Sequence, residues 1–87
     1  MMKKAKRRST SPKTSNSIDK FIGKRMCELR RARNLTQSDL GRLLGVSFQQ
    51  IQKYENGTNR VSAARLFNVC KAFKVPLASM FERDPTA

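Results

Sequence analysis

The chain has 87 residues, 19 of them Lys or Arg and six Asp or Glu, so its formal net charge at pH 7 is +13. That length suits one compact domain, which buries only about 60% of the surface of its unfolded chain and leaves little room for a catalytic cleft. The sequence has no His and two Cys far apart, which excludes His-dependent catalysis and zinc-ligand spacings. We therefore expect no enzyme, no metal and no cofactor.

The positive charge favours polyanionic partners, and nucleic acid, an acidic membrane surface and an acidic protein are all compatible with it. No apolar run approaches the roughly 20 residues of a membrane span. The basic N-terminus also lacks the apolar stretch that follows in a secretory signal. Two cysteines without a disulfide pattern fit a reducing compartment. We expect a cytoplasmic protein without a membrane partner.

Residues 1–16 differ in composition from the rest of the chain. They contain six basic residues, no acidic residue and a Ser/Thr/Pro cluster. With no large apolar side chain apart from two methionines, such a segment cannot offset the entropy lost on ordering. The sequence predicts a disordered basic arm over 1–16, a folded domain over 17–82 and a short polar tail over 83–87.

The first two helices are predicted from apolar periodicity and capping residues. The first runs from Ser17 to about Arg33. Its inward side chains are Phe21, Ile22, Met26, Leu29 and, less regularly, Ile18. The second begins after Thr36, whose hydroxyl can cap the first turn, and Asp39 completes a capping box. The buried stripe of the second helix is predicted to be Leu40, Leu43 and Leu44.

Three further helices complete the prediction. Ser47 begins the third with a second capping box to Gln50, and Gly57 ends it. Its inward residues are Ile51 and Tyr54. Ser62 caps the fourth, and Pro76 suits the first turn of a short fifth. Their predicted core residues are Leu66, Val69 or Cys70, Phe73, Leu77, Met80 and Phe81. No segment alternates with period two, so the predicted fold class is all-α, a compact five-helix domain.

Residues 35–57 form the informative block. Two short capped helices flank the turn Gly45-Val46-Ser47, and the small Gly41 stands where the helices must approach closely. That is the layout of a helix-turn-helix, whose second helix lies in the major groove of DNA.

Over roughly residues 22–81 the sequence resembles the Cro and phage-repressor family, also called the xenobiotic-response-element family. The resemblance is strongest at Leu35-Thr36-Gln37, Leu43-Leu44-Gly45-Val46-Ser47 and Tyr54-Glu55-Asn56-Gly57. It implies a lambda-repressor-like DNA-binding domain and a transcriptional regulator, in the first place a repressor. It also implies a homodimer on double-stranded DNA in a bacterial or phage nucleoid. We expect no small-molecule ligand.

The resemblance also implies roles for individual residues. The positions that read bases in the family correspond here to Phe48, Gln49 and Lys53, and Gln52 is a neighbouring candidate. A glutamine amide can bridge adenine N6 and N7, a lysine can donate to guanine, and an aromatic ring can pack on a thymine methyl. Phosphate-contacting positions match Gln37, Asn56, Thr58, Asn59 and Arg60. Arg30 and Glu55 match an internal ion pair of the family.

Two positions depart from the family pattern, and other functions stay open. Phe48 replaces a residue that is commonly polar, and Val61 stands where proline is frequent. An antitoxin-type protein-interaction module is one alternative function, and a nucleic-acid-coating protein without sequence preference is another. We interpret Cys27 and Cys70 as small apolar residues and not as redox sensors.

Overall fold

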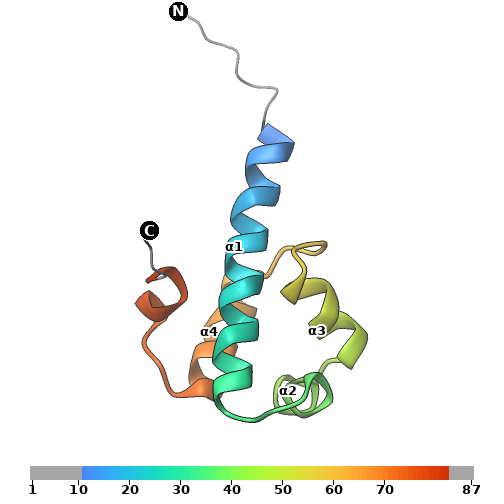
Figure 1. Ribbon diagram of the computed structural model, residues 1–87, viewed down its shortest axis with the longest axis vertical. Coiled ribbons are helices and arrows are strands. Elements are labelled where there is room, and N and C mark those ends of the chain that lie inside the picture. Colours follow the sequence, from blue (N-terminus) through green and yellow to red (C-terminus); the bar gives the residue numbers. More distant parts are fainter. Residues whose placement is uncertain (1–10, 83–87) are drawn as a thin grey trace, which may run out of the picture.

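The computed structural model describes the backbone of residues 11–82 and the side chains of residues 17–82. Within this range the elements in chain order are α1 (Ser11–Ala32), α2 (Gln37–Leu44), α3 (Phe48–Glu55), α4 (Ala63–Phe73) and the 3-10 helix η2 (Leu77–Phe81). Figure 1 shows α1 running along the long axis of the molecule, with α2 and α3 on one side of it and η2 on the other. The all-α class is confirmed for the described residues. A 3-10 helix stands where a fifth helix is predicted.

Helix α1 begins at Ser11, six residues before the predicted start at Ser17. A proline in the first helical turn, here Pro12, needs no amide hydrogen-bond partner, so the helix can extend through it. Residues 11–16, which we expect to belong to the arm, are therefore helical. The rest of the predicted arm and the predicted tail lie outside the described residues. Figure 1 shows the first turns of α1 projecting beyond the other elements.

The predicted capping residues begin α2, α3 and α4. At α2 the box is complete: the Asp39 amide donates to the Thr36 hydroxyl at 3.0 Å, and the Thr36 amide donates to the Asp39 carboxylate at 2.8 Å. That second bond is the main cause of a lowered pKa at Asp39. The Ser47 hydroxyl accepts from the Gln50 amide at 3.1 Å, which is one half of the predicted box. Ser62 caps α4 through its hydroxyl in the same way.

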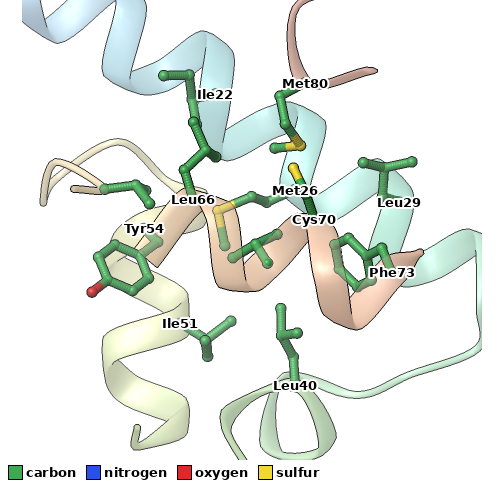
Figure 2. Packing of buried hydrophobic residues seen from close by; sticks show 12 residues of the cluster. Ile22, Met26, Leu29, Leu40, Ile51, Tyr54, Leu66, Cys70, Phe73 and Met80 are labelled. Atoms are coloured by element: carbon green, nitrogen blue, oxygen red, sulfur yellow. The ribbon is translucent and has the colours of Figure 1, made fainter. Parts of the chain in front are cut away.

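The core is built by side chains from all five elements (Figure 2). The buried apolar residues are Ile22, Met26, Leu29, Leu40, Ile51, Tyr54, Val61, Leu66, Val69, Cys70, Phe73 and Met80. Most were predicted from helical spacing. Burial raises the pKa of the Cys70 thiol. Both cysteines are free thiols, Cys27 half-buried and Cys70 buried.

Several residues predicted to be buried are exposed instead. Leu43 is 58% exposed and Phe81 is 50% exposed, and Phe21, Ile18 and Leu77 are exposed as well. In α2 the face directed to the core is formed by Leu40, Gly41 and Leu44. Consecutive residues of an α-helix are about 100° apart around its axis, so Leu43 points away from the direction of Leu44 and from the core. In η2 the tighter 3-10 winding rotates Phe81 by roughly 120° from the buried Met80.

Two glycines allow helices to approach backbone to backbone. A Cβ added at Gly23 in α1 would overlap the carbonyl oxygens of Tyr54 and Glu55 at the end of α3. A Cβ at Gly41 in α2 would lie 2.5 Å from the carbonyl oxygen of Val46. The first glycine sets the distance between α1 and α3, and the second closes the turn between α2 and α3.

No helix within residues 11–82 has both the length and the apolarity needed to cross a bilayer. Over the same residues no group of three or more potential ligands is arranged to hold a metal ion.

The contact at Gly23 makes a stability prediction. Gly23→Ala should lower the free energy of unfolding by about 1–3 kcal/mol, because α1 and α3 must move apart to admit the methyl group. Urea unfolding followed by circular dichroism would measure the change. The neighbouring Lys24→Ala, at an exposed position, is the control and should stay within about 0.5 kcal/mol. Equal stability of the Gly23 variant and the parent chain would contradict the close approach.

Candidate nucleic-acid interface

The segment α2–turn–α3 has the geometry of a helix-turn-helix. Helix α2 ends at Leu44, and the capping residue Gly45 adopts a left-handed conformation (φ 75°). The Val46 amide then donates to the Gly41 carbonyl at 2.9 Å, and Ser47 caps α3 directly afterwards. Because both ends of this turn are hydrogen-bonded, the angle between α2 and α3 is set by the backbone.

Helix α3 has one buried and one exposed face. Ile51 and Tyr54 point into the core. The four residues predicted to read bases lie at i, i+1, i+4 and i+5, which places them on one face of a helix. They are Phe48, Gln49, Gln52 and Lys53, and all four are exposed. The structure thus brings the predicted base-reading residues together on one surface.

The loop after α3 carries four of the residues predicted to contact phosphates. Asn56 accepts from the Thr58 amide through Oδ1 at 2.9 Å, which forms an Asx turn. The Asn59 amide donates to the Lys53 carbonyl at 3.1 Å. The Arg60 guanidinium lies 3.4 Å from the Asp19 carboxylate of α1 and is largely exposed. Local hydrogen bonds therefore hold this loop against the end of α3.

Gln37 is the fifth residue predicted to contact a phosphate, and it starts α2. It is half-buried, and its Nε2 donates to Glu55 Oε1 at 3.1 Å. The side chain of Gln37 thus has a protein partner. Gln37 also lies at the N-terminus of α2, where backbone amides can bind an anion such as a phosphate.

The ion pair that the resemblance implies is present at the centre of this region. Arg30 in α1 donates to Glu55 at the end of α3 through Nε at 2.7 Å and through Nη2 at 3.1 Å. The side chains are 9% and 6% exposed. The hydrogen bond with Glu55 is the main cause of a raised pKa at Arg30, so the guanidinium stays charged. Its Nη1 also donates to the Leu35 carbonyl at 2.7 Å.

Three arginines have structural partners that the sequence analysis did not identify. Arg25 donates to the Ser79 carbonyl at 2.6 Å, which attaches η2 to α1. Arg33 donates to the Phe73 carbonyl at 2.7 Å, and its guanidinium lies 5.0 Å from the centre of the Phe73 ring. Arg65 donates to the carbonyl of Leu44 at the end of α2. Arg33, directly after α1, fits the preference of basic side chains for helix C-termini, whereas no local pattern marks Arg25 or Arg65.

The sequence matches the helix-turn-helix family model HTH_3 over residues 28–80, which is more than half of the chain. The transcriptional regulator in the ATPase CF(0) region of Rhodospirillum rubrum is 48% identical over 69 residues, covering 79% of this chain and 64% of that protein. The antitoxin PezA of Streptococcus pneumoniae is 35% identical over 64 residues, covering 74% and 40%. The restriction-modification controller protein C.AhdI of Aeromonas hydrophila has a similar structure, with a TM-score of 0.71, 26% identity and coverage of 75% and 98%.

The chain belongs to the helix-turn-helix family of Cro and phage repressors, and several of its relatives are named as transcriptional regulators. It spans between about half and two thirds of the length of curated relatives that it matches. The similarity therefore concerns the domain that carries α2, the turn and α3.

The buried ion pair makes a second prediction. Glu55→Ala should lower the free energy of unfolding by about 3–5 kcal/mol, because Arg30 would remain charged and buried without its partner. Chemical unfolding at neutral pH would measure this loss.

A matched control is the exposed pair of Arg42 and Asp39, whose atoms are 2.6 Å apart. Arg42→Ala removes that pair, keeps the cap of α2, and should change stability by no more than about 1 kcal/mol. Similar losses for the two variants would show that burial of the Arg30–Glu55 pair carries no special weight.

Proposed function

We propose that α3 reads base pairs in the major groove of double-stranded DNA. We also propose that the protein regulates transcription by occupying an operator, with repression as the favoured mode. The observation that carries the proposal is the exposed face of α3, with Gln49, Gln52 and Lys53 side by side. That face is fixed by buried Ile51 and Tyr54 behind it. The major groove is about 12 Å wide and admits one α-helix.

The chemistry of the exposed face supports specific base contacts. Gln49 lies in the first turn of α3, where a helix-turn-helix recognition helix approaches base edges. Its amide can donate to adenine N7 and accept from N6, and Lys53 one turn later can donate to guanine. Phe48 offers an apolar surface for a thymine methyl. Asn56, Thr58, Asn59 and Arg60 would then contact phosphates beside the groove and fix the position of α3.

We further propose that the protein acts as a homodimer. Helix α3 has eight residues and a length of about 12 Å, so one copy reads few base pairs. Two copies related by a two-fold axis would read half-sites about 34 Å apart. Ile18 and Phe21 are exposed on α1, and Leu77 and Phe81 are exposed on η2, so apolar surface is available for self-association.

Selection of binding sites from a random DNA duplex pool at physiological salt tests this function. A two-fold-related motif, bound about 10³-fold or more tighter than scrambled DNA, is the expected result. If no motif is enriched and binding is lost as salt rises, the protein coats nucleic acid through its charge, and sequence-specific regulation is excluded.

The role proposed for Gln49 in base reading can be tested by a single substitution. Gln49→Ala should weaken binding to the selected site by about 1–3 kcal/mol, because one pair of base hydrogen bonds is lost, and should leave binding to scrambled DNA nearly unchanged. Fluorescence anisotropy with both duplexes would measure the two affinities. Asn68→Ala is a suitable control, because Asn68 is an exposed amide on α4, outside the face formed by Phe48, Gln49, Gln52 and Lys53, which we call the reading face. An equal loss on both duplexes would argue against base readout by Gln49.

The similarity to PezA supports a second candidate, an antitoxin-type module that binds a protein partner. Such a protein would still present a helix-turn-helix. A growth assay distinguishes the antitoxin function from transcriptional regulation. An antitoxin restores growth to cells that express its partner, and Gln49→Ala would leave that rescue intact.

A further inference from the structure

Two large apolar side chains remain exposed on neighbouring helices, away from the reading face. Leu43 near the end of α2 and Phe67 in the middle of α4 are each 58% exposed. The helical spacing of α2 predicts Leu43 in the core, and the structure places it at the surface. Between the two helices lies an open hollow of about 310 Å³, lined by Leu43, Leu44, Asn68, Lys71 and Ala72. We refer to this hollow, with the adjoining Phe67, as the α2–α4 groove.

The α2–α4 groove has a fixed floor. Arg65 donates to the Leu44 carbonyl at 3.0 Å and so joins α4 to the end of α2. Val69 and Phe73 on the inner side of α4 are buried in the core. Ala72 contributes little side-chain volume, which leaves the hollow beside Lys71. Because α2 and α4 are held by the core, the groove does not have to form when a partner arrives.

The charged residue that lines the groove, Lys71, is positive. The Lys71 ammonium lies 5.5 Å from the centre of the Phe67 ring, which keeps it beside the groove. No acidic residue occurs from residue 61 to residue 75. In α2 the single acidic residue is Asp39, whose carboxylate is occupied by the Thr36 amide and the Arg42 guanidinium. The local field therefore favours a ligand that brings carboxylates.

This charge pattern argues against a second copy of the chain or DNA as the occupant of the groove. A second copy docked here on itself would place Lys71 near its own counterpart, and like charges across an interface are unfavourable. DNA would leave Leu43 and Phe67 facing phosphates. None of the residues that line the groove comes from α3. An occupant of the groove can therefore be bound while α3 contacts DNA.

We propose that the α2–α4 groove binds an acidic amphipathic helix of another protein. Its leucine or phenylalanine side chains, at i, i+3 or i+4 spacing, enter between Leu43 and Phe67. Its flanking carboxylates face Lys71. Apolar contact supplies the larger part of the affinity, and the charges select acidic over basic helices. The protein then has one surface for DNA and a separate surface through which a second protein acts on it.

The test uses the full chain and two synthetic helical peptides of about 16 residues. Both carry leucines at the same i, i+3, i+4 and i+7 positions. One has glutamate and the other has lysine at every flanking position. Fluorescence anisotropy measures affinity, and amide chemical shifts of the ¹⁵N-labelled protein locate the site. The expected result is binding of the acidic peptide alone, with shift changes concentrated at the residues of the α2–α4 groove.

Paired variants separate the groove from general effects. Leu43→Ser should weaken binding of the acidic peptide by at least about tenfold through lost apolar contact. Lys71→Glu should weaken it by at least about threefold. The controls Leu77→Ser on η2 and Lys24→Glu on α1 make the same chemical changes at exposed positions elsewhere and should have no effect. Affinity for DNA, measured on the same Leu43→Ser protein, should be unchanged, so a failure here is distinguishable from a failure of the proposed DNA binding.

Several results would overturn the proposal. They are equal affinity for the two peptides, no binding of the acidic peptide at millimolar concentration, and shift changes centred outside the groove. Equal weakening by the control variants would have the same meaning. Sedimentation equilibrium gives a further check: if Leu43→Ser lowers the mass of a dimer formed by the parent chain, the groove is an interface between copies.

Discussion

The buried contact between Arg30 and Glu55 is the interaction on which the arrangement of the first three helices depends. Each partner comes from a different helix, and the guanidinium also holds the Leu35 carbonyl in the connection to α2. Glu55 in turn accepts from Gln37 at the start of α2. One carboxylate therefore joins α1, α2 and α3. Since both charges are removed from water, the arrangement is stable only when all of these hydrogen bonds form together.

This contact explains how a small core can orient a recognition surface. The buried residues supply most of the apolar stabilisation, but apolar packing is not directional. The direction of α3 is set by polar and steric elements, namely the Arg30–Glu55 pair, the close approach at Gly23 and the hydrogen-bonded turn after Gly45. The turn after Gly45 holds the start of α3, and the other two contacts hold its end. A helix of eight residues can then present its outer face without relying on its own helix propensity.

The parts of the fold that follow from local rules could be predicted from the sequence, and the parts that depend on neighbours could not. Capping by Thr36, Ser47 and Ser62 is a contact within one turn, so the starts of three helices were predicted correctly. The exposure of Leu43 depends on which side of α2 meets the core, and periodicity in an eight-residue helix leaves that choice open.

The same contrast between locally determined features and features that depend on neighbouring elements holds for η2 and for the candidate site. Local periodicity indicates neither the 3-10 winding of η2 nor the exposure of Phe81, and the bond from Arg25 to the Ser79 carbonyl joins segments far apart in the sequence. For the site, the pattern of residues 47–57 indicated which side chains of α3 are exposed, and the structure agrees. The roles of those side chains toward DNA stay predictions, because they depend on a partner. The internal bond of Gln37 required the folded arrangement to become visible.

The arginines that hold carbonyl groups have a consequence for how the sequence can vary. Arg25, Arg33 and Arg65 each use a planar, multi-donor guanidinium to reach a backbone oxygen on another element. A lysine carries the same charge but a different donor geometry, so an exchange at these positions would preserve the isoelectric point and still loosen the domain. Exposed basic positions such as Lys24 and Arg31 are not under that restriction. Among divergent copies of this domain, arginine and lysine should therefore be interchangeable on the surface and distinct at positions 25, 33 and 65.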